Sequence, residues 1–135
     1  MRWSESIDMY CERTDPGLWS EPLNVATNLA FLLAAALLWR QAGRGAGRDT
    51  RVLILLIGAV GLGSMAFHTL ATRWAALLDI GFIAVFVLFF HQRFQVRALG
   101  RSNGAANLGV AVFVVLAGLF VLATKQLPTL SQNDS

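Results

Sequence analysis

The stretch "GSMAFHTLATRWAALLD", residues 63–79, places a serine, a histidine and an aspartate inside an otherwise apolar run from Val52 to Phe90. A single α-helix over this run would extend about 58 Å, nearly twice the ~30 Å hydrocarbon core of a bilayer. We therefore expect the run to fold back as a hairpin of two helices. The polar segment "ATRW" at 71–74 suits the turn, because Arg73 and Trp74 are residue types that anchor at a membrane interface.

The overall composition is typical of a membrane protein. Of the 135 residues, 56% are hydrophobic and only 14% are charged, and the mean hydropathy of +0.57 exceeds that of ordinary soluble domains. The net charge of +3 comes mainly from arginines that lie between apolar segments, so nucleic-acid binding is not expected. The single Cys11 excludes an internal disulfide and a cysteine-based zinc site.

Four apolar segments have the length that spans a bilayer, and they predict one all-α integral membrane domain over residues 1–135. The expected antiparallel transmembrane helices cover about 23–39, 52–71, 75–91 and 105–124, with an acidic N-terminal segment at 1–22 and a polar tail at 125–135. The two longer loops, "RQAGRGAGRDTR" and "HQRFQVRALGRSNG", contain seven arginines. The positive-inside rule places these loops in the cytoplasm, and the N-terminus, the turn at 71–74 and the tail on the outer side.

This topology brings the polar side chains of the hairpin to one depth. Ser64 and His68 are four residues apart and share one face of the second helix, while Asp79 lies about one turn below the same outer boundary on the third. Ionisable groups inside a membrane are costly and usually face a partner or a cavity. The three side chains are therefore expected to point inward to a shared site.

The first helix carries a matching polar stripe. Glu21, Asn24 and Asn28 fall on one helical face, and the stripe begins at the same outer boundary. We therefore predict a cluster of four side chains toward one end of the bundle: Glu21, Ser64, His68 and Asp79.

Structural explanations stay open for the residues of the second helix. His68 near a helix end fits hydrogen-bonded packing, and Ser64 with Gly61 and Gly63 fits a set of small residues that let helices approach closely. His91 cannot join His68 in one site. It lies twelve residues beyond the aspartate, which is about 18 Å along a helix.

Structural explanations also exist for the other polar positions. A bridge to Arg73 would satisfy the charge of Asp79, although the two residues are six positions apart and less aptly placed on a helix. Asn24 and Asn28 can join helices through their amides. The combination of these polar residues at their spacings is more specific for a functional site than any one of them alone.

The segment "IDMYCERTDPGLWSEPLNVATNLAF" (7–31), followed by "GSMAFHT" (63–69) and by an aspartate eleven residues after the histidine, resembles the alkaline ceramidase family of membrane hydrolases, particularly its bacterial members. The resemblance covers about residues 7–80 by motif, and the remaining chain by helix pattern. In that family seven helices enclose a zinc ion, bound by one histidine of the second helix and two of a late HxxxH motif. The resemblance implies that the four helices correspond to the first four of such a bundle.

The resemblance also implies the roles of the clustered residues. His68 becomes a zinc ligand, Ser64 a polar group beside the metal water or the amide oxygen, and Asp79 the residue that transfers the proton to the leaving amine. The implied function is a zinc-dependent amide hydrolase that cleaves ceramide-type membrane lipids to a sphingoid base and a fatty acid. The implied partner is the lipid substrate, and the sequence does not fix an oligomeric state.

A structural calcium ion is implied by the same resemblance. The matches "YCER" and "SEPLN" carry Glu12 and Glu21 to the family's N-terminal calcium site, and Asp8 joins them with a spacing that differs by one residue. Thr14 stands where some members have asparagine.

The chain departs from the family pattern after its fourth helix. It ends with "KQLPTLSQNDS" and contains no HxxxH, whereas a hydrolytic zinc site normally needs three protein ligands. We favour a fragment or truncated product of a seven-helix enzyme. Chains that complement one another, and a hydrolase that has lost activity, are the alternatives.

Two other classes of function remain. A small four-helix transporter would carry its acid near the bilayer midplane, but Glu21 and Asp79 are expected near the outer edge. A non-catalytic membrane protein, such as a receptor-like or assembly subunit, would suit the missing zinc ligands. Metal content separates this last class from the enzyme.

Overall fold

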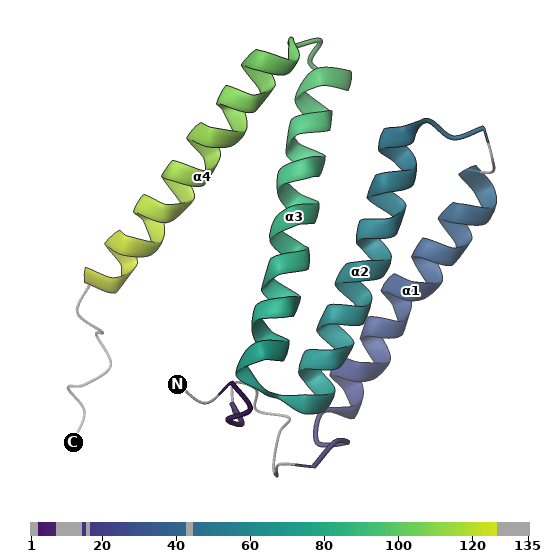
Figure 1. Ribbon diagram of the computed structural model, residues 1–135, viewed down its shortest axis with the longest axis vertical. Helices are drawn as coiled ribbons and strands as arrows, with labels where there is room; N and C mark the ends of the chain where they lie inside the picture. The colour runs from purple at the N-terminus through teal and green to yellow at the C-terminus, as the bar shows by residue number, and fades with distance from the viewer. Residues whose placement is uncertain (1–2, 8–14, 16, 43–44, 127–135) are drawn as a thin grey trace. The chain divides into compact units, whose positions relative to one another are not determined.

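The computed structural model describes residues 3–7, 15, 17–42 and 45–126. Four α-helices follow one another: α1 (Pro22–Ala42), α2 (Arg48–Leu70), α3 (Arg73–Arg97) and α4 (Asn103–Gln126) (Figure 1). Each helix is long and apolar enough to cross a membrane. The described residues contain no strand, only an isolated bridge between Ser6 and Thr72. The prediction of four apolar membrane-length helices is confirmed.

All four helices extend further into the arginine-bearing loops than the apolar pattern predicted, and two of them do so by four residues or more. α2 begins at Arg48 instead of about residue 52, and α3 continues to Arg97 instead of about residue 91. Apolar residues mark the part of a helix inside the hydrocarbon, whereas arginine is a good helix former and continues the helix beyond it. After α3 the chain turns at Gly100, whose φ of 65° lies in the left-handed region that favours glycine.

The hairpin turn lies where the sequence predicted it and is shorter. Only Ala71 and Thr72 stand between α2 and α3, so Arg73 and Trp74 already belong to α3. Ala71 adopts the left-handed conformation with φ of 44° and donates its N–H to the carbonyl of Phe67 at 2.7 Å. This bond closes the last turn of α2 and reverses the chain within two residues.

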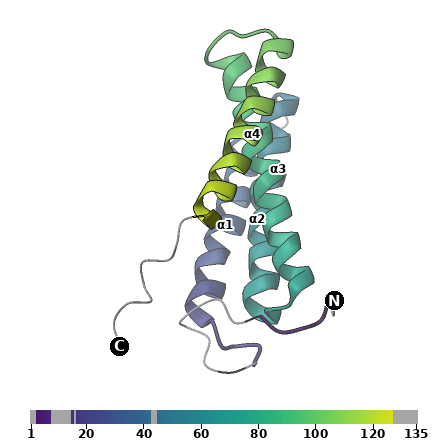
Figure 2. The ribbon, with the colours of Figure 1, turned by 90° about the vertical axis from the view of Figure 1, so that its left-hand side faces the viewer.

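The chain divides into two compact units, Met1–Phe90 and His91–Ser135. In the first unit α1 and α2 lie side by side, and the start of α1 lies at the same end as the α2–α3 turn (Figures 1 and 2). A Cβ atom at Gly61 would lie 2.9 Å from the Phe31 Cβ on α1, and one at Gly63 would lie 2.7 Å from the Phe82 ring on α3. Small residues on α2 therefore allow close contact with both neighbours, and α2 is the most buried of the four helices.

The N-terminal segment lies against the α2–α3 turn. Ile7 donates its N–H to the carbonyl of Ala71 at 2.7 Å, and the carbonyl of Trp3 accepts the N–H of Trp74 at 3.3 Å. Glu5 also forms an ion pair of 3.2 Å with Arg73. The segment before α1 and the hairpin turn therefore share one end of the unit, as the alternating topology requires.

The second unit contains the end of α3, the loop that follows it and the whole of α4. Its buried contact centres on Ala106, whose carbonyl accepts the Gln95 side-chain amide at 3.3 Å. Most of α4 exposes its apolar side chains, among them Leu116, Leu119 and Phe120. Side chains of this kind suit a lipid environment, because acyl chains are as apolar as the residues themselves.

Candidate active site

The residue that precedes α1 is positioned by the helix start. Pro22 occupies the first helical position, where its missing N–H costs nothing, and the carbonyl of Glu21 accepts the first helical bond from Val25 at 3.0 Å. Before it, Asp15 forms a local turn by accepting the N–H of Gly17 at 2.6 Å. These bonds fix the backbone at Glu21 and direct its side chain into the unit, where only 2% of the residue is exposed.

The Glu21 carboxylate meets the imidazole of α2. Its Oε2 lies 2.5 Å from the Nδ1 of His68, and both side chains are buried. Asn24, one turn further along α1, donates its side-chain amide to the same oxygen at 3.2 Å. An ionised carboxylate accepts hydrogen bonds and donates none, so a hydrogen bond to an ionised Glu21 requires the Nδ1 proton on His68.

Asp79 approaches the same cluster from α3. Its carboxylate interacts with the Ser64 side chain through a hydrogen bond and with His68 electrostatically. Asp79 is 8% exposed, and its Oδ1 is one of two buried side-chain atoms without a hydrogen-bond partner in the described part of the chain. Buried polar atoms are nearly always satisfied, so an orphaned carboxylate oxygen indicates a place for a proton, a water or a ligand.

The four predicted side chains therefore lie together at the end of the first unit that carries the α2–α3 turn. Glu21 comes from the start of α1, Ser64 and His68 from α2, and Asp79 from α3. The alternative bridge between Asp79 and Arg73 is not the arrangement found, since Arg73 pairs with Glu5. The polar stripe on α1 also faces inward, because Asn28 is buried.

The cluster contains one side chain of the kind that binds zinc, the imidazole of His68. Because Nδ1 of His68 faces Glu21, Nε2 is the ring nitrogen that a metal ion would use, and a carboxylate on the other ring nitrogen is the usual support for a histidine ligand. Among residues 3–7, 15, 17–42 and 45–126, no group of three or more His, Cys, Asp or Glu side chains is arranged to hold a metal ion. The donor chemistry fits one zinc ligand, and the described residues do not complete the set.

The predicted calcium ligands divide between two parts of the chain. Asp8 and Glu12 lie outside the described residues, and Glu21 lies beside His68.

Two features at this end of the first unit had no sequence signal. Depth matching predicted that Glu21 and His68 would be near one another, but it did not predict that His68 would take Glu21, 47 positions away, as its Nδ1 partner. The second buried oxygen without a partner in the described residues, Thr72 Oγ1, lies in the turn between α2 and α3 and had no sequence signal. Its burial follows from the packing of the turn, which no local pattern encodes.

Three comparisons with known proteins give no further assignment: no family model, no curated protein and no solved structure matches this chain.

Proposed function

We propose that this chain carries part of the active site of a ceramidase-like, zinc-dependent amide hydrolase of the membrane. The substrate class is a ceramide-type lipid, which is cleaved to a sphingoid base and a fatty acid. The observation that carries the proposal is the buried contact between Glu21 Oε2 and His68 Nδ1 at 2.5 Å, next to a carboxylate with an orphaned oxygen.

His68 is the proposed zinc ligand, through Nε2, and Glu21 orients its ring. A carboxylate on Nδ1 fixes the tautomer and raises the basicity of the ligand nitrogen, an effect worth about 10- to 100-fold in metal affinity at known sites. Glu21 is buried at the start of α1, and its carbonyl accepts the first hydrogen bond of that helix. Its backbone is therefore fixed, and its carboxylate can hold the imidazole of His68 in one orientation.

Asp79 is the proposed proton-transfer residue. Amide cleavage requires that a proton reaches the nitrogen that leaves, and a carboxylate within the site can carry it. Asp79 Oδ1 is buried and has no hydrogen-bond partner within the described residues, so this oxygen can exchange a proton without first breaking a bond in the protein. Ser64, which hydrogen-bonds to this carboxylate, holds its orientation and offers a hydroxyl to the substrate carbonyl.

A complete site requires two more zinc ligands, and the proposal takes them from polypeptide outside the described residues. When bound by enough ligands, zinc supplies an activated water for attack on the amide. One imidazole is too few, because catalytic sites use three protein ligands and affinity falls steeply with fewer. Further helices with an HxxxH motif, or a second polypeptide, are the sources that this proposal names.

We also propose that Glu21 joins Asp8 and Glu12 in a calcium site that braces the start of α1. Calcium prefers six to eight oxygen ligands, and the acidic segment before α1 offers carboxylates and carbonyls. The proposal gives Glu21 a double role, as the Nδ1 partner of His68 and as a calcium ligand.

A non-catalytic membrane protein is the second candidate, and one observation favours it: the described residues form no group of three metal-binding side chains. In that case the contact between Glu21 and His68 serves packing alone. The transporter alternative has no such support, since the cluster lies at one end of the unit, next to the turn at Ala71 and Thr72.

The experiment compares the 135-residue chain with a fusion that adds the last three helices of a seven-helix family member, which carry HxxxH. Zinc content and fatty-acid release from a ceramide are measured for both proteins in detergent micelles. The proposal predicts about one zinc per fusion and lipid cleavage by the fusion, with neither in the shorter chain. If the protein is non-catalytic, neither the shorter chain nor the fusion releases fatty acid, and zinc has no effect on either.

A further inference from the structure

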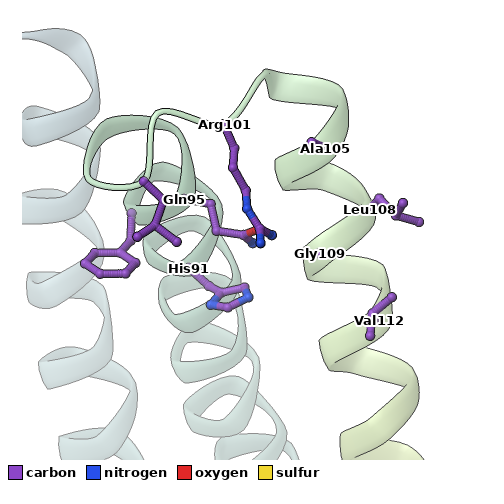
Figure 3. Close-up of a pocket in the computed structure, with 9 residues that line it drawn as sticks. His91, Gln95, Arg101, Ala105, Leu108, Gly109 and Val112 are labelled. Carbon is purple, nitrogen blue, oxygen red and sulfur yellow. The ribbon is translucent and has the colours of Figure 1, made fainter.

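A second candidate site lies in the other unit of the protein. A groove of about 570 Å³ runs between the end of α3 and the first turns of α4 (Figure 3). One part of the groove is polar and contains His91, Gln95 and Arg101. The rest is apolar and is lined by Phe94, Leu99, Ala105, Leu108 and Val112.

The guanidinium of Arg101 is held at the groove by a buried amide. Its Nη1 donates to the Oε1 of Gln95 at 2.8 Å, and Gln95, which is only 3% exposed, donates its own amide to the carbonyl of Ala106 at 3.3 Å. Figure 3 shows the Arg101 side chain reaching from the loop toward Gln95 and His91. A flexible loop arginine is thus fixed in place, so a ligand meets it with little further loss of side-chain freedom.

The fixed arginine retains capacity for an anion. A guanidinium has five N–H donors in a planar fork that matches two oxygens of a phosphate, and the bond to Gln95 uses one of them. The imidazole of His91 lies on the same groove, with its ring centre 5.2 Å from that of Phe113. Both groups present nitrogen donors to the same space.

The surroundings of the groove favour negative charge. Residues 91–126 contain Arg93, Arg97, Arg101 and Lys125 and no aspartate or glutamate. The described residues of this unit therefore carry positive charge and no carboxylate that would repel an anion at the groove. Basic pockets between membrane helices are known to bind lipid headgroups.

We propose that this groove binds an anionic glycerophospholipid of the adjacent leaflet. Its phosphate pairs with Arg101 and His91, and the first part of an acyl chain lies along the apolar wall formed by Ala105, Leu108 and Val112. A groove of this volume is in the range that accommodates small lipid-like ligands. The proposal rests on the membrane location of the helices and is independent of hydrolase activity, because the groove and the cluster around His68 belong to different units.

The test uses the full chain in non-ionic detergent at physiological salt, with native mass spectrometry as the readout. The three probes are dioctanoyl phosphatidylglycerol, dioctanoyl phosphatidylcholine and inorganic phosphate. We expect one phosphatidylglycerol per chain, at least about ten-fold weaker binding of phosphatidylcholine, and no retained phosphate, because the phosphate lacks the acyl contact.

Variants separate a specific groove from diffuse attraction. Arg101→Gln should weaken phosphatidylglycerol binding by about 10-fold or more, since it removes charge-assisted hydrogen bonds. Ala105→Trp, at an exposed position, should weaken binding by filling the apolar part while leaving all charges in place. Arg97→Gln removes the same charge from α3 outside the groove lining and should change binding by less than about three-fold.

Four results would overturn the proposal. Equal affinity for phosphatidylglycerol and phosphatidylcholine would show that the groove does not distinguish lipids by the charge of their headgroup. An equal loss in Arg97→Gln and Arg101→Gln would show general attraction to a basic segment. Binding of inorganic phosphate as tight as that of phosphatidylglycerol, or unchanged lipid binding in Ala105→Trp, would show a free anion site.

Discussion

The Oε2 of Glu21 lies 2.5 Å from the Nδ1 of His68, and this buried contact joins the start of α1 to the end of α2. Two residues that are 47 positions apart thereby fix one another inside an apolar unit. The contact sets which nitrogen of the histidine faces away from α1, and the proposed chemistry depends on that nitrogen.

Removal of this carboxylate should destabilise the first unit. Glu21→Ala leaves a buried imidazole without its acceptor, and an unsatisfied buried donor costs about 1–3 kcal/mol. Glu5→Gln is the matched control, because its ion pair with Arg73 is about half exposed and such pairs contribute about 0–1 kcal/mol. Chemical unfolding of both variants in micelles measures the difference. Equal midpoints for the two variants would contradict a stabilising role of the buried contact.

The tautomer of His68 can be observed directly. The ¹⁵N spectrum of labelled protein at neutral pH should show Nδ1 as the protonated nitrogen of His68, because this nitrogen faces a carboxylate. His91→Gln assigns the signals, since the chain contains two histidines. Glu21→Ala should remove the preference. A spectrum in which Nε2 carries the proton in the wild type would refute the orientation on which zinc binding through Nε2 depends.

Close packing at α2 predicts opposite effects of two glycine substitutions. A Cβ atom at Gly63 would lie 2.7 Å from Phe82 and 3.3 Å from the Cα of Asp79, whereas a Cβ atom at Gly81 meets nothing within 4 Å. Gly63→Ala should therefore cost about 1–3 kcal/mol of unfolding free energy through overpacking. Gly81→Ala should be neutral or gain up to about 1 kcal/mol from helix propensity. Unfolding midpoints measure both, and a stabilising Gly63→Ala would disagree with the packing of α2 on α3.

The proposed calcium site predicts a ligand-dependent stability. Calcium at about 100 times its dissociation constant should stabilise the wild type by about 2.7 kcal/mol, and chelation should remove this gain. Glu21→Ala should lose the response as well as part of its basal stability. Thermal unfolding with and without chelator checks this, and an identical absence of response in both proteins would exclude the site.

Much of the fold follows from local information. A continuous apolar run too long for one helix requires a hairpin, and a polar tetrapeptide at 71–74 marks its position within two residues. The exact helix ends were less predictable, because hydropathy reports the hydrocarbon boundary, while the helix ends at Ala42 and Arg97 depend on backbone hydrogen bonds beyond it.

The sequence predicted which residues lie together in the candidate site, and it did not predict which of their side chains contact one another. Equal depth from the turn brought Ser64, His68 and Asp79 together, and the stripe on the first helix added Glu21. Which carboxylate contacts Nδ1 depends on helix rotation and on the close approach allowed by Gly61 and Gly63. These are properties of the packed unit, and helical spacing alone does not contain them. The contact between Arg101 and Gln95 is likewise fixed by the loop that follows α3.

The most direct test of the proposed function is fatty-acid release from a ceramide by the fusion that carries the HxxxH helices, measured with matched variants. His68→Ala should lose bound zinc and cleavage together, Asp79→Asn should keep zinc and lose cleavage, and His91→Ala should keep both. These outcomes would assign the zinc ligand and the proton-transfer residue. Zinc-dependent cleavage that survives His68→Ala, or that the 135-residue chain performs alone, would contradict the account.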